Sequence, residues 1–297
     1  MVVHFFKLIR WQNLSMLIII QLLFKYVLFK NYPIAISLSN FDFALLVLAI
    51  IFIAAGGNVI NDFFDIETDN INKPTKVIVG TAFSEYQAKF IYVILTISGI
   101  IFGASLSYSK QFPYLSIIFI AIAGLLFLYS NYLKRIALIG NILISLLIGF
   151  SILLLGVFDV FPNSGNPDNA LVLNVMFVYI AFAFSLNLIR EIIKDIEDID
   201  GDYSSEMRTL PIVIGRKRTQ NCTFFLSILF TFILIFTITF YRHLSNFILG
   251  YGFLFIIVPL LYFCYQLYHA NTKQDFKKLS FLLKLIMVSG MLSIFII

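Results

Sequence analysis

The chain is poor in charged residues, which make up only 12% of its 297 residues. An ordinary soluble domain carries about 25%. Hydrophobic residues account for 60% of the chain, and the mean hydropathy is +0.95. A single soluble core cannot bury so large an apolar surplus, so a soluble globular protein is excluded. The apolar segments run almost from end to end, and we expect one integral membrane domain over residues 1–297.

Cysteine and histidine are also scarce, with two cysteines and three histidines in the chain. Cys222 and Cys264 lie in or beside apolar runs, without CxxC spacing or a nearby histidine pair, so we expect buried, unreactive thiols and no zinc site. The net charge of +5 does not indicate a nucleic-acid partner, because the basic residues lie between apolar runs and form no stripe with aromatic residues.

Long apolar runs are the main feature that the sequence does have. A membrane-spanning helix needs about 20 mostly apolar residues, and the runs are too long for strands and do not alternate with period two. Because lipid-exposed backbone requires helices or a closed barrel, we predict an all-α, polytopic membrane protein with about nine transmembrane helices. The expected spans are about 13–29, 42–60, 88–107, 113–130, 137–158, 170–190, 221–241, 246–267 and 279–297.

The distribution of basic residues predicts the orientation of these spans. Of 21 lysines and arginines, sixteen lie at the N-terminus or after even-numbered spans, three lie on the opposite side, and two fall inside spans. Cytoplasmic loops carry the excess of lysine and arginine. The N-terminus and the segments after even-numbered spans are therefore expected in the cytoplasm, and the C-terminus outside.

Acidic residues concentrate in two of these inner segments, 57–80 and 190–215, in which the stretches 61–69 and 194–202 alone hold nine of the sixteen Asp and Glu residues. Aligning NDFFDIETD (61–69) with KDIEDIDGD (194–202) gives the shared pattern D-x-x-D-x-x-x-D, and each copy leads to a stretch that ends in three β-branched residues and glycine. The matched pairs are Asp62 with Asp195, Asp65 with Asp198, Ile66 with Ile199, and Asp69 with Asp202. This match predicts an internal repeat with the functional site where the halves meet.

The spacing of the motifs would place their oxygen ligands in columns. Residues at i, i+4 and i+8 share one face of a helix, so Asn61, Asp65 and Asp69 would line up. Asp198 and Asp202 have the same spacing.

The second motif continues this pattern with Asp195, about one turn before the other two acids. Gly201 offers a point at which its helix could end, and Asp202 would then present from a loop. Either arrangement yields a column of oxygen ligands.

So many carboxylates beside lipid are costly unless they are neutralised. Lys73, Lys194 and Arg208 can pair with only a few of them, whereas divalent cations could neutralise the rest. Oxygen ligands without Cys or His favour Mg²⁺ or Ca²⁺. Since Mg²⁺ commonly combines carboxylates with phosphate oxygens, two facing columns predict a diphosphate held between Mg²⁺ ions. A solvated acidic face is the alternative, but it does not account for two matched motifs at one membrane face.

The two motifs resemble the aspartate-rich motifs of the UbiA superfamily of intramembrane prenyltransferases, with N-D-x-x-D-x-x-x-D at 61–69 and D-x-x-x-D at 198–202. GNVINDFFDIETDNINKP, YSNYLKR (129–135), REIIKDIEDIDGD and RTLPIVIG are similar to the branch of digeranylgeranylglyceryl phosphate synthases, also called geranylgeranylglycerol-phosphate geranylgeranyltransferases. Nine helices and cytoplasmic motif loops also fit. The chain departs from that branch at Lys76 and Val77, where arginine and proline are common, and in YSSEMRTLP, which lacks a glycine common before T-L-P.

The resemblance implies Mg²⁺-dependent transfer of a prenyl group from a prenyl diphosphate, with a role for each matching residue. The implied metal ligands are Asn61, Asp65, Asp69, Asp198 and Asp202. Asp62 and Asp195 would act in catalysis as further ligands or groups that orient water. The basic residues on the same face, which we assign to substrate binding, are Arg10, Lys73, Lys134, Arg135, Lys194 and Arg208, with Lys134 and Arg10 favoured for the diphosphate. Tyr129 and Tyr203 would stabilise the allylic cation that C–O cleavage leaves.

The sequence leaves two classes of molecule for the second substrate, the acceptor of the prenyl group. A prenylglycerol phosphate hydroxyl would give an ether lipid, with geranylgeranyl as the transferred group, whereas an aromatic ring would give a quinone precursor. A divalent-cation transporter is a remote alternative, because its carboxylates would lie near the bilayer midplane. The expected partners are the two substrates and membrane lipid, and the sequence indicates no protein partner.

Overall fold

The computed structural model describes residues 1–240 and 246–296, and within these the chain is helical without strands. Nine helical runs among the described residues are long and apolar enough to cross a membrane, which confirms the predicted all-α, polytopic fold. The spans are Trp11–Asn31, Asn40–Phe64, Glu85–Ser109, Pro113–Asn131, Ile139–Asn163, Pro167–Glu197, Arg216–Thr239, Phe247–His269 and Lys273–Phe295.

The chain divides into two compact units. The first unit comprises Met1–Leu22, Tyr32–Lys134 and Phe150–Met176, and the second comprises Leu23–Asn31, Arg135–Gly149 and Phe177–Ile297. The expectation of one domain over the whole chain stays a prediction.

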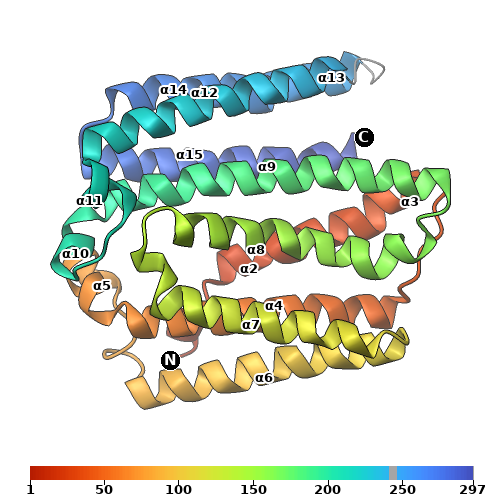
Figure 1. Ribbon diagram of the computed structural model, residues 1–297, viewed down its shortest axis with the longest axis horizontal. Helices are drawn as coiled ribbons and strands as arrows, with labels where there is room; N and C mark the ends of the chain where they lie inside the picture. The colour runs from red at the N-terminus through yellow and green to blue at the C-terminus, as the bar shows by residue number, and fades with distance from the viewer. Residues whose placement is uncertain (241–245, 297) are drawn as a thin grey trace. The chain divides into compact units, whose positions relative to one another are not determined.

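Helices α4, α6 and α7 pack side by side in the first unit (Figure 1). The elements of this unit are α1 (Val2–Leu8), α2 (Trp11–Leu23, up to Leu22), α4 (Asn40–Phe64), α5 (Ile66–Asn72), η2 (Pro74–Lys76), α6 (Glu85–Ser109), η3 (Pro113–Leu115), α7 (Ser116–Asn131), η4 (Leu133–Arg135, up to Lys134), the end of α8 (Ile139–Leu155, from Phe150), η5 (Gly156–Val160), η6 (Phe161–Asn163) and the start of α9 (Pro167–Glu197, up to Met176). Glycines allow the close approach, since a Cβ added at Gly99 would lie 2.9 Å from the backbone nitrogen of Ile53.

Gly103 provides a test of this packing. A Cβ added there would lie 2.3 Å from Cγ of Phe119, whereas one added at Gly124 would have no neighbour within 4 Å. We expect Gly103→Ala to destabilise the protein by about 1–3 kcal/mol, as overpacking of a close contact does. Thermal unfolding in detergent would show a lower Tm for Gly103→Ala and an unchanged or higher Tm for the control Gly124→Ala; equal Tm values would refute the packing described.

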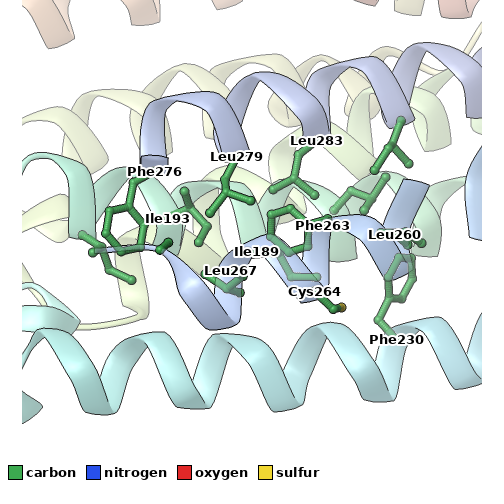
Figure 2. Packing of buried hydrophobic residues seen from close by; sticks show 14 of the residues in the cluster. Ile189, Ile193, Phe230, Leu260, Phe263, Cys264, Leu267, Phe276, Leu279 and Leu283 are labelled. Atoms are coloured by element: carbon green, nitrogen blue, oxygen red, sulfur yellow. The ribbon is translucent and has the colours of Figure 1, made fainter. Parts of the chain in front are cut away.

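A hydrophobic cluster on α9, α12, α14 and α15 forms the core of the second unit (Figure 2). Its helical elements are η1 (Phe24–Leu28), α3 (Phe29–Asn31), α8 (Ile139–Leu155), α9 (Pro167–Glu197, from Phe177), α10 (Ile199–Ser204), α11 (Leu210–Ile214), α12 (Arg216–Phe240), α13 (Asn246–Gly252), η7 (Phe253–Ile257), α14 (Val258–His269), α15 (Lys273–Leu292) and η8 (Ser293–Phe295). Ile189 and Ile193 of α9 pack with Phe263 of α14 and Leu283 of α15. This core fixes the end of α9 from which the second acidic motif emerges.

Both acidic motifs interrupt their helices at the same position of the repeat. Helix α4 ends at Phe64 and α5 begins at Ile66, with Asp65 between them at φ −97° and ψ 5°. Helix α9 ends at Glu197 and α10 begins at Ile199, and Asp198 has φ −101° and ψ 10°. The i, i+4 spacing of the first motif did not predict this interruption at its central aspartate, although Asp65 and Asp69 still donate from their backbone nitrogens to the carbonyl oxygens of Asn61 and Asp65.

The repeat extends past the motifs to two glycines. Gly80 and Gly215 have φ +87° and +88°, a left-handed conformation that glycine adopts without a steric penalty. Gly201, in contrast, does not end a helix as anticipated, because it lies inside α10. These shared breaks and turns support the internal repeat that the two sequence motifs predict.

Candidate functional site

The first acidic motif forms a network of carboxylates and basic side chains in the first unit. Arg10 donates from Nη2 to Oδ1 of Asp62 at 2.7 Å, and Lys134 pairs with Oδ1 of Asp65. Asn61 donates from Nδ2 to the other oxygen of Asp65 at 2.7 Å. Five of the residues that the sequence singles out are thus brought together, although Arg10 and Lys134 lie far from the motif along the chain.

The fold positions each cation of this network. Leu8 of α1 is buried against Val59 of α4, and Arg10 follows α1 in a left-handed turn with φ +54°. Lys134 lies in the short helix after α7, and its side chain is only 8% exposed. The charge of Asp62 raises the pKa of Arg10 above its ordinary value, although burial opposes the shift. Arg10 is therefore fully charged, and both cations are held against the motif.

Negative charge remains in excess at the far end of this motif. Burial, and then the charge of Asp65, raise the pKa of Asp69, and Lys73 counters the shift only in part. Oδ1 of Asn61 is buried and accepts no hydrogen bond within the described part of the chain. An unused amide oxygen beside crowded carboxylates suits a hard cation such as Mg²⁺, which takes oxygen ligands.

No ready-made cluster of three His, Cys, Asp or Glu side chains able to hold a metal is found over residues 1–240 and 246–296. Asp62 and Asp65 instead face Arg10 and Lys134. The donor set fits a hard cation in its chemistry, and carboxylates would have to turn from their basic partners to bind it.

The second acidic motif lies at the end of α9 and in α10 of the second unit. Asp195 lies on α9, because this helix extends seven residues beyond the expected span end at 190. Its Oδ2 accepts a hydrogen bond of 2.9 Å from Nδ2 of Asn141 on α8. Asp202 lies in α10 and is 7% exposed. Asp195 and Asp202 are thus both held within packed structure.

Asn141 was not among the predicted site residues, although it begins a chain of hydrogen bonds between polar residues of α8 and α9. Ser145 donates to the carbonyl oxygen of Asn141 at 2.6 Å, and Asn187 donates to Oγ of Ser145 at 3.2 Å. All three side chains are buried. The available signal was an asparagine inside an apolar run, because polar groups at membrane depth are costly and often functional.

Arg190 and Glu191 were also missed. Arg190 donates from Nη1 to Oε1 of Glu191 at 3.1 Å, and Lys194 donates from Nζ to Oε2 at 2.7 Å. Glu191 is buried, and it links the predicted substrate-binding residue Lys194 to Arg190.

The remaining predicted residues differ in their surroundings. Tyr129 interacts electrostatically with Arg10 and so lies at the first motif. Tyr203 is 74% exposed, so it excludes no water in this conformation. The backbone nitrogen of Arg208 donates to the carbonyl oxygen of Arg135 at 2.8 Å, and both arginines are exposed. Their roles, like those of the other site residues, stay predictions.

One free cysteine contradicts its expected burial. Cys264 is buried on α14, whereas Cys222 is exposed on α12. Cys222 lies on a face of α12 that also exposes Phe225 and Leu229. Its position in an apolar run was therefore not enough to predict that its side chain is buried.

Known proteins are similar to this chain in sequence and in fold. The model of the UbiA prenyltransferase family matches residues 28–286. A digeranylgeranylglyceryl phosphate synthase of Methanosphaera stadtmanae is 33% identical over 250 residues, which cover 83% of each chain. A solved structure described as digeranylgeranylglyceryl phosphate synthase in membranes superposes with a TM-score of 0.66 at 25% identity, covering 99% of this chain and 98% of the other.

A UbiA homologue from Archaeoglobus fulgidus, bound to DMAPP and Mg²⁺, shares the fold with a TM-score of 0.63 at 14% identity, covering 99% of each chain. The family match extends over most of the chain, with seven of its nine described spans matched in full and two in part. The protein is therefore a multi-pass integral membrane prenyltransferase, and it belongs to the UbiA prenyltransferase family.

Proposed function

We propose that this enzyme transfers a prenyl group, geranylgeranyl in the simplest case, from its diphosphate to the hydroxyl of a prenylglycerol phosphate and so forms an ether lipid. The observation that carries the proposal is the pairing of carboxylates with cations in the first motif, Asp62 with Arg10 and Asp65 with Lys134. Such a group can exchange its internal ion pairs for Mg²⁺ and a diphosphate. The name of the Methanosphaera stadtmanae relative supports the choice of acceptor.

We assign the metal to the oxygen donors of the two motifs. Asn61, Asp65 and Asp69 would hold Mg²⁺ in the first motif, and Asp198 and Asp202 in the second. Bound Mg²⁺ would neutralise the diphosphate and make it a better leaving group. Both motifs are required for one transfer reaction in this assignment.

The side chains around the metal ligands take the other steps. Arg10 and Lys134 turn from Asp62 and Asp65 to the diphosphate oxygens and hold the donor in place. The bond between C1 of the donor and the diphosphate oxygen breaks, and the diphosphate leaves with the electron pair. The acceptor hydroxyl then forms the new C–O bond.

Asp195 takes the proton that the acceptor hydroxyl loses. Asn141 binds one oxygen of this carboxylate, which fixes its orientation and leaves the other oxygen for the acceptor. A carboxylate within hydrogen-bond reach of a reacting hydroxyl is the usual requirement for such a base. Tyr129, beside Arg10, offers its ring to the allylic cation.

The choice of acceptor can be tested by competition. Purified protein with geranylgeranyl diphosphate and Mg²⁺ would be given geranylgeranylglyceryl phosphate and hydroxybenzoate or a naphthoate together, and the products separated by mass spectrometry. We expect the ether lipid as the product, with less than about 1% aromatic product, since a site that binds a polar group rejects substrates lacking it. Turnover of the aromatic acid alone would refute the proposal in favour of an aromatic prenyltransferase.

The proposed orientation places the N-terminus and both acidic motifs in the cytoplasm and the C-terminus outside. It rests on the excess of basic residues in the inner segments. A fluorescent protein that folds only in the cytoplasm should therefore be bright when fused to the N-terminus and dark when fused to the C-terminus. The reverse pattern would overturn the assignment.

A further inference from the structure

Three charged side chains on α9 form a compact group that the reaction steps above do not use as a unit. Glu191 binds Arg190 through Oε1 and Lys194 through Oε2, at 3.1 and 2.7 Å. One carboxylate therefore holds a guanidinium and an ammonium group beside each other. We call these residues, Arg190, Glu191 and Lys194, the α9 triad.

The α9 triad is partly buried, and within it two cations share one anion. The side chains of Arg190 and Glu191 are only 14% and 11% exposed, that of Lys194 is 31% exposed, and the carboxylate of Asp195 is a neighbour. Nε of Arg190 is buried and donates no hydrogen bond within the described residues. A buried donor on a charged group without a partner is costly. The group is therefore suited to an anion that accepts several hydrogen bonds.

The position of the triad distinguishes two sources for that anion. Arg190 precedes Asp198 by eight residues, or about 12 Å along a helix, and helical side chains lean toward the N-terminus. Arg190 therefore lies about two helical turns before the acids assigned to the metal and the diphosphate. The donor's diphosphate is the less suitable partner.

The acceptor's phosphate fits the spacing better. Glu191 precedes Asp195 by four residues, so the two lie on one face of α9 about 6 Å apart along the axis. The charges of Glu191 and Lys194 both act on Asp195, which confirms that the triad and this carboxylate are neighbours. In a prenylglycerol phosphate only the short glycerol backbone separates the phosphate from the reacting hydroxyl.

We infer that Arg190 and Lys194, held in position by Glu191, bind the phosphate of the acceptor while its hydroxyl lies at Asp195. This inference rests on the proposed function and deepens it, because it names the group by which the enzyme selects a phosphorylated glycerol lipid. The triad binds the phosphate through a planar guanidinium fork and a point charge, which together suit a phosphate monoester.

The test removes the two partners of this contact separately. Wild type and Arg190→Gln would be assayed with geranylgeranylglyceryl phosphate and with geranylgeranylglycerol, which lacks the phosphate. We expect Arg190→Gln to lower kcat/KM for the phosphorylated acceptor about 10- to 100-fold, mainly through KM, as loss of hydrogen bonds to a charged group does. The kcat/KM for geranylgeranylglycerol and the KM for the donor should stay within about twofold of wild type.

Further variants distinguish loss of phosphate binding from a structural change in α9. Arg190→Lys should recover part of the affinity, and Lys194→Gln, at a more exposed position, should reproduce the selective loss. Lys277→Gln, an exposed lysine on α15, is the control and should behave as wild type. Each variant must elute as a single species in detergent.

Two outcomes would overturn the inference while the proposed function stands. An equal loss with both acceptors would assign Arg190 and Lys194 to stabilising α9, and a raised KM for the donor alone would assign them to the diphosphate. If wild type transferred a prenyl group to neither acceptor, both the proposed function and this inference would fail.

Discussion

Replacing Asp198 by Asn is expected to lower kcat on the order of 10³-fold, because a carboxylate ligand of the metal that stabilises the leaving diphosphate is lost. Asp65→Asn should have an effect of the same size, since Asp65 occupies the equivalent helix break in the first motif. The Tm in detergent should change little for Asp198→Asn, and it should fall for Asp65→Asn because the buried ammonium of Lys134 loses its paired carboxylate. Steady-state rates of ether-lipid formation at saturating Mg²⁺ measure the effect.

Each motif offers its own control for this prediction. Glu67 and Asp200 are exposed neighbours of the central aspartates. We expect Glu67→Gln and Asp200→Asn to retain wild-type rates within a few-fold, because surface substitutions away from a site have small effects. If Asp198→Asn retained more than about a tenth of the activity, the metal assignment would be contradicted, given the factor that such ligands supply.

Lys134→Met should lower kcat/KM for the prenyl diphosphate about 100-fold, because the diphosphate loses a buried cation and charge-assisted hydrogen bonds. The ammonium group now faces Asp65, and its side chain is only 8% exposed. Lys134→Arg, which keeps the charge, should restore part of the rate. Kinetics with the donor varied at saturating acceptor measure the change.

The control for Lys134 is Lys7, an exposed lysine of α1 in the same unit. Lys7→Met should leave the kinetics unchanged. A Lys134→Met enzyme with an unchanged KM and kcat for the donor would show that the lysine only balances the charge of Asp65.

Membrane spans were predictable from the sequence because their length and hydropathy are local properties. The helix breaks at Asp65 and Asp198 were not, since the i, i+4 spacing of the acids is that of a continuous helix. The backbone at these residues still follows the helical hydrogen-bond pattern, with Asp69 donating to Asp65 and Asp202 to Asp198. The spacing of the acids therefore indicated both motifs but not the interruption at the centre of each.

Contacts between segments that lie far apart in the sequence were also not predictable from it. Arg10 reaches Asp62 and Lys134 reaches Asp65 across 52 and 69 residues of sequence, and only the fold of the first unit shows these pairs. The resemblance selected both cations for the diphosphate without indicating that carboxylates hold them. The bond between Asn141 and Asp195 spans 54 residues and had no sequence signal beyond a polar residue in an apolar run.

The central claim is that an acceptor hydroxyl displaces the diphosphate from the donor. Geranylgeranylglyceryl phosphate labelled with ¹⁸O in its free hydroxyl, incubated with the purified enzyme, geranylgeranyl diphosphate and Mg²⁺, tests it most directly. We predict that the ether lipid retains the label and that the released diphosphate contains none. Label in the diphosphate, or an unlabelled or absent ether product, would contradict the claim.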